Sequence, residues 1–272
     1  MGDTPDKGLL LGRQVAVSGR YAPELLYPIP RAPAREALGI DPLAPPFAGV
    51  DLWHAYELSW LDGEGRPLSR VGRFMVPAGS PHLVESKSFK LYLNSLNQER
   101  FDNEEAAVRR ICADLAVVAG APVALALFAV DDPLLAGHPL PGECLDGLPG
   151  RWRPGEPDAD QLCTVAGEGM AVHTHLLRSL CPVTGQPDWA SVWIATEGGS
   201  LDRLSLLEYL LAYRNHQEFH EQCVERIFRD IQLACRPREL HVQAFYTRRG
   251  GLDITPFRST GGREPLSRMN RQ

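Results

Sequence analysis

The sequence predicts an α+β protein that contains two copies of one module with antiparallel strands. Two strands, two helices and two further strands are expected in the same order in both halves, although the last strand of the first copy is unclear. The segment 105–111 (EAAVRRI) also resembles the segment 221–227 (EQCVERI) after a shift of 116 residues. Similarity at a fixed offset is typical of a duplicated structural unit.

The individual elements follow from the spacing of apolar residues. In the first copy, apolar and polar residues alternate over 52–61 and 68–76 on either side of a glycine-containing turn, which predicts two paired strands. Helical periodicity over 88–96 and 103–118 and an apolar run over 123–130 complete this copy. In the second copy, strands are expected over 171–177, 189–195, 240–247 and 252–256, and helices over 204–213 and 216–234.

Prolines indicate where the modules begin and end. The first fifty residues contain eight prolines, and proline lacks the N–H that helices and central strands require, so we expect an N-terminal arm over 1–50. A second stretch rich in proline and glycine predicts a linker over 131–165. The first module then covers 51–130 and the second covers 166–272.

Composition excludes several classes of protein. The net charge of −6 argues against direct binding of nucleic acid, which requires a concentrated basic surface. The apolar stretch 115–130 is interrupted by Gly120 and Pro122 and is too short to cross a membrane, and the first residues lack the pattern of a signal peptide. The six cysteines form no C-x-x-C pair, so no disulfide scaffold is expected. We therefore expect a soluble cytoplasmic protein.

Cys181 is the cysteine best placed for chemistry, because it lies in a turn-rich link between two expected strands. The ordinary alternative for any cysteine is a small buried hydrophobic residue. Asp188 follows seven residues later and can hold or donate a proton if the turn doubles back, or else it is a simple turn residue. His220 and Glu221 are neighbours on an expected helix. They can grip the N–H edge of a heterocycle, or they are partly exposed helix residues.

Cofactor and metal signals are weaker. His173 and His175 share one face of an expected strand, but their spacing from other cysteines matches no closed zinc pattern, so no metal site is assigned. The glycines around 167–172 do not form the dinucleotide-binding fingerprint, so a nicotinamide cofactor has to bind without a Rossmann domain. Arg249 and Gly250 lie in an expected hairpin turn that can meet a phosphate, the alternative being a solvated basic turn.

Three blocks together resemble a known family. Residues 85–90 (ESKSFK), 181–188 (CPVTGQPD) and 218–223 (EFHEQC) resemble the NADPH-dependent 7-cyano-7-deazaguanine reductases of queuosine biosynthesis, in their long two-module form. The resemblance covers nearly the whole chain, from about residue 11 to 259. It implies the tunnelling fold, a β-β-α-α-β-β module present twice, with antiparallel sheets and helices on one face. It also implies reduction of a nitrile to a primary amine with two NADPH consumed.

The resemblance implies a role for each matching residue. Cys181 would attack the nitrile carbon to form a thioimidate, and Asp188 would activate the thiol and protonate the nitrogen. The residues implied to bind the deazapurine substrate are Val84, Glu85, Ser86, His220 and Glu221. The residues implied to bind NADPH are Ser86, Lys87, Arg249 and Gly250. The chain departs from the family beside the nucleophile, where Leu180 and Pro182 replace an asparagine and an aliphatic residue. This difference concerns the rate of the reaction more than the assignment to the family.

Three other functions remain open at this stage. A cysteine hydrolase could use Cys181 on a nitrile or amide without NADPH. A zinc-dependent, pterin-type enzyme of the tunnelling fold could bind zinc with Cys181 and either His173 or His175. A purine-binding module that has lost catalysis would bind the base through Glu221. Because small antiparallel sheets leave unpaired edges, we also expect a homodimer.

Overall fold

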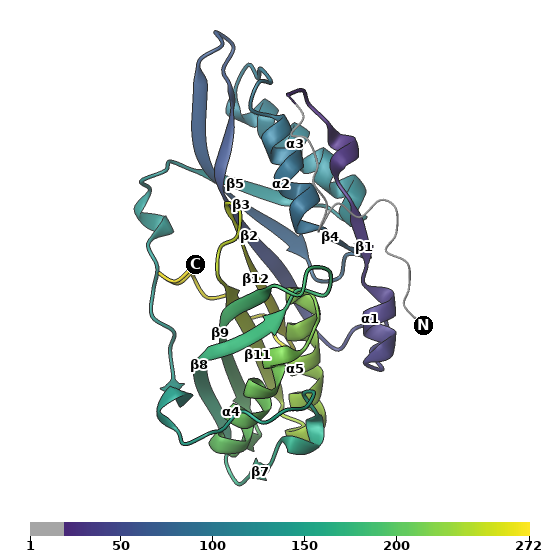
Figure 1. The fold of residues 1–272 in the computed structure, drawn as a ribbon, viewed down its shortest axis with the longest axis vertical. Coiled ribbons are helices and arrows are strands. Elements are labelled where there is room, and N and C mark those ends of the chain that lie inside the picture. The colour runs from purple at the N-terminus through teal and green to yellow at the C-terminus, as the bar shows by residue number, and fades with distance from the viewer. Residues whose placement is uncertain (1–18) are drawn as a thin grey trace.

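The computed structural model describes residues 19–272, so the first 18 residues of the expected arm lie outside the described part of the chain. The described residues form one long sheet of eight strands in the order β5-β3-β2-β12-β11-β9-β8-β6. Neighbouring strands are antiparallel except for β6 and β8. Figure 1 shows the strands of the first half above those of the second half along the long axis of the molecule.

The two halves repeat the same elements. The first half contains β2 (Ala48–Leu61), β3 (Pro67–Pro77), β4 (His82–Val84), α2 (Ser86–Ser95), α3 (Glu104–Ala119) and β5 (Ala124–Phe128). The second half contains β8 (Gly169–Leu180), β9 (Pro187–Glu197), β10 (Ser200–Leu201), α4 (Arg203–Ala212), the 3₁₀ turn Tyr213–Asn215, α5 (His220–Cys235), β11 (Glu239–Tyr246) and β12 (Leu252–Ser259). The first half ends one strand early, with β5 as the end strand of the sheet. Strand β12 pairs with β2 and joins the halves into one sheet.

Short elements make up the rest of the described chain. Before β2 lie the 3₁₀ turn Pro23–Leu25, β1 (Pro28–Pro30) and α1 (Ala32–Ala37). Between β5 and β8 lie the 3₁₀ turns Pro133–Leu135, Leu145–Gly147 and Ala159–Gln161, with β6 (Glu143–Cys144) and β7 (Thr164–Val165). The division into an arm, two modules and a linker at the borders given above stays a prediction, since the sheet runs through both halves without interruption.

The helices of both halves cover the same face of the sheet. Val242 of β11 lies opposite Ile194 of β9 and Arg258 of β12, and Ile254 of β12 lies opposite Trp53 of β2. Directly opposed residues point to the same face, and alternate residues of one strand share a face. Val242 and Ile194 pack with α4 and α5, and Arg258 bonds to Glu225 of α5. Ile254 and Trp53 pack with α2 and α3 on the same face (Figure 1). The prediction of antiparallel strands with helices on one face is confirmed.

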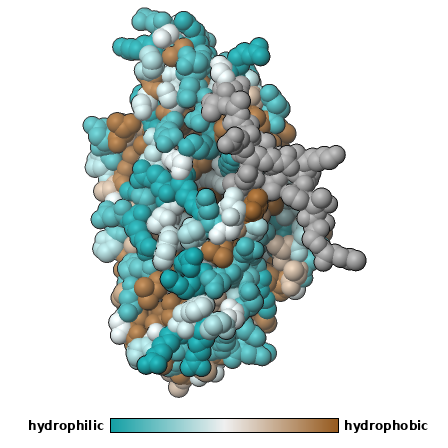
Figure 2. Space-filling view, in the orientation of Figure 1, coloured by the Kyte–Doolittle hydropathy of each residue, from teal (hydrophilic) through white to brown (hydrophobic). Residues whose placement is uncertain are grey.

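The other face of the sheet carries a smaller apolar cluster. Trp193, Phe245 and Phe257 pack there against Leu140 from the connection between the halves and Met269 near the C-terminus. On the face seen in Figure 2, polar residues predominate and apolar ones form small groups. No helix in residues 19–272 is both long and apolar enough to cross a membrane.

The sequence similarity between the halves corresponds to a shared core. Helices α3 and α5 each contain 16 residues, and their first residues are 116 positions apart. The matching inward positions of the two helices are fully buried: Ala107 with Cys223, Ile111 with Ile227, and Leu115 with Ile231.

One predicted boundary is wrong in a way that affects the site. The helix expected from residue 216 begins at His220. The segment before it is extended, because the N–H of Leu180 donates to the carbonyl of His216 at 2.8 Å and Phe219 has a ψ of 155°. His220 and Glu221 therefore occupy the first turn of α5, where a helix presents free N–H groups and not ordinary helix surface.

Candidate active site

All the residues proposed from the sequence for catalysis, substrate or cofactor line one pocket of about 250 Å³. The first half supplies the junction of β4 and α2, with Val84, Glu85, Ser86 and Lys87. The second half supplies the β8–β9 turn with Cys181 and Asp188, the start of α5 with His220 and Glu221, and the β11–β12 turn with Arg249 and Gly250. The pocket lies where the two halves meet, so neither half forms it alone.

The β8–β9 turn brings Cys181 and Asp188 to the same pocket. The N–H of Cys181 donates to the carbonyl of Gln186 at 2.8 Å, and the N–H of Gly185 donates to the carbonyl of Cys181 at 2.9 Å. Gly185 has a φ of +67°, which glycine adopts readily. In the paired strands that follow, Ser179 lies opposite Asp188. The chain therefore doubles back as the sequence argument required, and both side chains are only 6% exposed.

Asp188 contacts a positively charged or ionisable group on each carboxylate oxygen. Its Oδ2 lies 3.3 Å from Nε2 of His220, and its Oδ1 lies 2.9 Å from the guanidinium of Arg249. The ring of His220 stacks on Tyr246 with centroids 3.8 Å apart, which fixes its orientation. The other ring nitrogen, Nδ1, is buried and has no hydrogen-bond partner among the described residues. The geometry connects the carboxylate of Asp188 with the first turn of α5.

Glu221 is the free acceptor of the pocket. It is 4% exposed, and its carboxylate has no side-chain hydrogen bond or ion pair within residues 19–272. The pKa of Glu221 is raised to about 7, mainly by burial and then by the charge of Asp51, while His220 and Arg31 oppose the shift. The matching residue of the first half, Glu105, is exposed. The duplicated acidic position therefore faces a pocket in the second half only.

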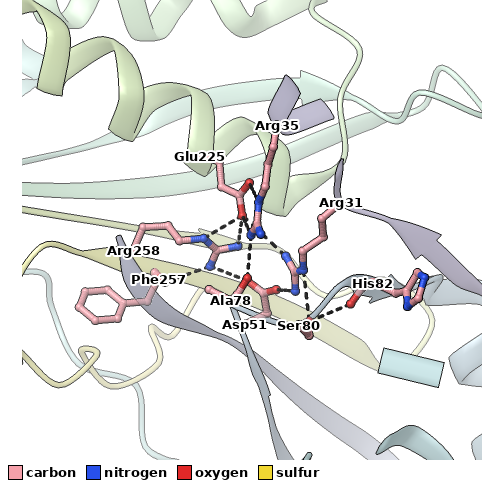
Figure 3. A network of polar contacts seen from close by, with 9 residues as sticks. All are labelled: Arg31, Arg35, Asp51, Ala78, Ser80, His82, Glu225, Phe257 and Arg258. Carbon is pink, nitrogen blue, oxygen red and sulfur yellow. Dashed lines mark hydrogen bonds and ion pairs between the residues drawn. The ribbon is translucent and has the colours of Figure 1, made fainter. Parts of the chain in front are cut away.

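A buried ionic network includes Glu225 of α5 (Figure 3). Glu225, one helical turn after Glu221, accepts hydrogen bonds from Arg35 at 2.8 and 2.9 Å and from Arg258 at 2.8 and 3.1 Å. Asp51 accepts from Arg258 at 2.7 Å and from Arg31 at 2.5 Å. All five side chains are at most 3% exposed. The network connects α1, β2, β12 and α5, and so holds the arm against the helix that carries Glu221.

Sequence reasoning missed this network. Its members are separated by up to 227 residues and belong to no shared motif. The local signal that could have pointed to it is the pair Arg31 and Arg35, because residues four apart lie on one face of a helix. An arginine pair with that spacing is ordinarily read as solvent-exposed, so the partners Asp51 and Glu225 could not be inferred.

Glu85 begins helix α2. Its carboxylate accepts from the N–H of Lys87 at 2.8 Å and the N–H of Ser88 at 2.7 Å, which is the usual role of an N-cap residue. Burial raises the pKa of Glu85, although both N–H groups oppose that shift. This capping places Ser86 and Lys87 in the first turn of α2, at the pocket wall.

The positive charges of the pocket come from three side chains. Lys87 and Lys90 of α2 and Arg249 of the β11–β12 turn all line it. Gly250 has a φ of +57°, which lets the turn close tightly beside Arg249. Lys90, which lies in the ESKSFK block but was assigned no role, also forms an ion pair with Glu57 at 3.6 Å.

The two strand histidines do not belong to this pocket. His173 and His175 lie together with Cys144, and none of the three lines the cavity that contains Cys181. The alternative in which Cys181 and one of these histidines hold zinc is therefore wrong in its geometry.

One pocket thus holds a buried thiol, a buried carboxylate, an acceptor without a side-chain partner in the described chain and three cations, which are the groups used in covalent catalysis on a small polar molecule with an anionic cofactor. The family described as "Nitrile reductase, 7-cyano-7-deazaguanine-reductase N-term" matches residues 18–127, and the family described as "QueF-like protein" matches residues 187–265. The chain belongs to the family of NADPH-dependent 7-cyano-7-deazaguanine reductases.

Several similar proteins carry that name, and their similarity to this chain extends over almost their full length. A relative from Chromohalobacter salexigens is 51% identical over 265 residues, which cover 94% of this chain and 92% of the relative. A relative from Dechloromonas aromatica is 52% identical over 94% of this chain and 92% of its own length. A third, from Stenotrophomonas maltophilia, is 53% identical over 93% of this chain and 92% of its own length. Each is named NADPH-dependent 7-cyano-7-deazaguanine reductase.

Proposed function

We propose that this protein reduces the nitrile of 7-cyano-7-deazaguanine to the primary amine of 7-aminomethyl-7-deazaguanine, a step of queuosine biosynthesis, with NADPH as the reductant. The observation that carries the proposal is that Cys181, Asp188 and the unpaired Glu221 line one buried pocket. The chain that forms this pocket is about half identical to named reductases over more than nine-tenths of its length. A hydrolase or a binding-only module receives no support from either source.

The side chains of the pocket divide the chemistry between them. The sulfur of Cys181 adds to the nitrile carbon while Asp188 takes the thiol proton and passes it to the nitrogen, which gives a thioimidate. This C=N–H group accepts hydride more readily than a nitrile does. Two molecules of NADPH, bound one after the other, would each supply one of the two hydrides that the overall reduction requires. Between them the carbon–sulfur bond breaks, and Cys181 leaves as the thiolate. The burial of Cys181 and Asp188 limits the access of water that would hydrolyse the intermediates.

Substrate orientation comes from the first turn of α5. Glu221 in its carboxylate form accepts N–H groups of the deazaguanine, and this acceptor is otherwise without a side-chain partner in the described chain. His220 lies between Asp188 and the stacked ring of Tyr246, so it fixes the position of the proton-transfer group. Val84, Glu85 and Ser86 of the first half also line the pocket.

The residues at the pocket fit NADPH. Lys87, Lys90 and Arg249 place three cations on its wall, which suits the phosphates of a dinucleotide. Ser86, Lys87, Arg249 and Gly250 would hold the cofactor. Arg249 also contacts Asp188 at 2.9 Å, so the cofactor wall and the proton-transfer group are adjacent.

We propose further that the enzyme is a homodimer that works in the cytoplasm without binding nucleic acid directly. Strand β5 supports the assembly part of this proposal, since it is the end strand of the sheet and pairs with β3 alone in residues 19–272. An unpaired strand edge is commonly covered by association. Analytical ultracentrifugation of the full chain tests the dimer, and a monomeric mass at micromolar concentration would contradict it.

Intact-protein mass spectrometry tests the mechanism. Wild type mixed with 7-cyano-7-deazaguanine without NADPH should gain one substrate mass, and Cys181→Ala should gain none. The matched control is Cys163→Ala, which removes an exposed thiol outside the pocket and should keep the adduct. Adding NADPH should discharge the adduct with two cofactors oxidised per product. An adduct that persists in Cys181→Ala, or a different cofactor stoichiometry, would overturn the proposal.

A further inference from the structure

Three metal-binding side chains converge at the end of the sheet that carries β6. One ligand atom from each of Cys144, His173 and His175 lies within 4.8 Å of the others. The two histidines alternate along β8 and so point to one face, and Cys144 of β6 pairs with His173 in parallel register. None of them lines the active-site pocket. We propose that these residues form a site for a divalent transition-metal ion of the zinc class, separate from the reductase chemistry.

The histidines are oriented as metal ligands are. Nδ1 of His173 lies 3.2 Å from the carbonyl of Pro141, to which its N–H donates, and Nδ1 of His175 lies 2.8 Å from the hydroxyl of Ser191. Neither Nε2 has a hydrogen bond among the described residues. The lone pair of Nε2 is available in His173, whose Nδ1–H donates to a carbonyl, and in His175 when its Nδ1–H donates to Ser191. Metal-binding histidines characteristically hydrogen-bond through the nitrogen that does not hold the metal, which fixes the tautomer and the ring.

The backbone is built to bring Cys144 to the histidines. Gly142 has a φ of +89°, and a Cβ at this position would lie 2.3 Å from the carbonyl oxygen of Ala171. A side chain there would push β6 away from β8 and separate Cys144 from His173. The glycine therefore permits the close approach on which the three-residue cluster depends.

The chemical types of the three ligands determine which class of metal ion the site favours. One thiolate and two imidazoles favour zinc or cobalt over magnesium or calcium, which prefer oxygen ligands. Bonds of about 2.0–2.3 Å place tetrahedral ligands about 3.5 Å apart, so the cluster must contract by about 1 Å. Cys144 is exposed and can supply that movement. The carboxylate of Asp146 already accepts hydrogen bonds from Thr174 and from the N–H of His175, so it is not used as a metal ligand. The fourth coordination position of the ion is therefore left for water.

The ion would fasten the connection between the halves to the sheet. Strand β6 contains two residues and is the end strand, so its backbone pairing with β8 is weak on its own. A metal bound by one side chain of β6 and two of β8 links them directly. An ion that binds only the folded chain raises its stability by mass action. Metal binding should therefore change the stability of the protein and not its reaction, since none of the three metal ligands lines the active-site pocket.

Cobalt titration of the full chain tests the proposal. Apoprotein, prepared with a chelator and a phosphine reductant, is titrated with Co²⁺, and thiolate-to-cobalt charge transfer is followed in the near ultraviolet. Wild type should bind one equivalent and show the band, and Zn²⁺ should displace the cobalt and raise the melting temperature. Cys144→Ser should lose the band, and His175→Ala should weaken binding at least about tenfold. Cys163→Ser removes another exposed thiol from the connection between the halves. This variant should keep both the charge-transfer band and the binding of one equivalent of Co²⁺.

Two further measurements sharpen the test. Ser191→Ala, which removes the partner of His175 and no ligand, should weaken binding about tenfold while keeping the band. The reductase activity of wild type should be the same with and without zinc. Absence of saturable cobalt binding, a band that survives in Cys144→Ser, or loss of the band in Cys163→Ser would each overturn the site.

Discussion

Replacing Glu225 with glutamine tests whether the buried network holds the molecule together. Glu225 accepts two hydrogen bonds from each of Arg35 and Arg258, and its carboxylate lies 3.7 Å from Arg31. The cluster contains three guanidinium groups and two carboxylates, all nearly inaccessible to water (Figure 3). Glu225→Gln keeps the shape of the side chain but leaves the three arginines with Asp51 as the single carboxylate partner in the network.

The expected cost is large because the arginines stay buried after their partner is neutralised. Removing one member of a buried ion pair costs about 3–5 kcal/mol in free energy of unfolding, since the remaining charge is left without compensation. That is a large part of the about 5–15 kcal/mol by which folded proteins are stable. The matched control is Glu197→Gln. Glu197 pairs with Arg238 at 2.9 Å on the surface, and such exposed pairs contribute about 0–1 kcal/mol.

Urea unfolding followed by tryptophan fluorescence measures both variants. The pH dependence provides a second readout. Burial alone would raise the pKa of Glu225, but Arg258, Arg35 and Arg31 together lower it below its usual range. A lowered folded pKa contributes stability above the unfolded value, and that stability is lost as pH falls through the folded value. Wild type should lose this contribution in acid, and Glu225→Gln should lack it. A loss below about 1 kcal/mol at neutral pH would refute the reasoning.

Two further predictions concern the pocket. Because burial raises the pKa of Glu221 to about 7, its carboxylate form is lost as pH falls below that value. The Kd for 7-cyano-7-deazaguanine should therefore rise up to about tenfold per pH unit below 7, and a calorimetric profile that keeps this slope in Glu221→Gln would contradict the assignment. Arg249→Ala removes a cation from the pocket wall and the partner of Asp188, so steady-state kinetics should show the KM for NADPH raised about 10–100-fold. The exposed Arg238→Ala should change nothing, and an equal effect in both variants would exclude a specific role for Arg249.

Much of the fold could be predicted from local patterns. Alternating apolar residues over 52–61 and 68–76 gave strands within a few residues of β2 and β3, because the side chains of a strand that face the helices recur at every second position. The similarity of 105–111 and 221–227 became a shared buried face of α3 and α5. The start of α5 was wrong by four residues, because the preceding segment bonds to β8 and not to its own helix.

The candidate site was predictable residue by residue only through the blocks that resemble a family. Periodicity and spacing left Cys181, Asp188 and His220 with ordinary structural alternatives, and nothing local connected them with Glu85, about a hundred residues away. The metal-ligand candidates show the same limit. His173 and His175 were visible as a pair, but the cysteine that lies close to both is Cys144 and not Cys181.

The sequence by itself therefore determined the repeated elements, the helical face that each copy buries and the chemical types needed for nitrile reduction. These depend on the order of residues along a strand or a helix. The tertiary structure decided which residues meet, because β12 pairs with β2 and joins the halves into one sheet. That pairing brings the start of α2 to the start of α5, and it buries Arg258 of β12 between Asp51 and Glu225. Burial changes what these charges do, and burial is a property of the assembled chain.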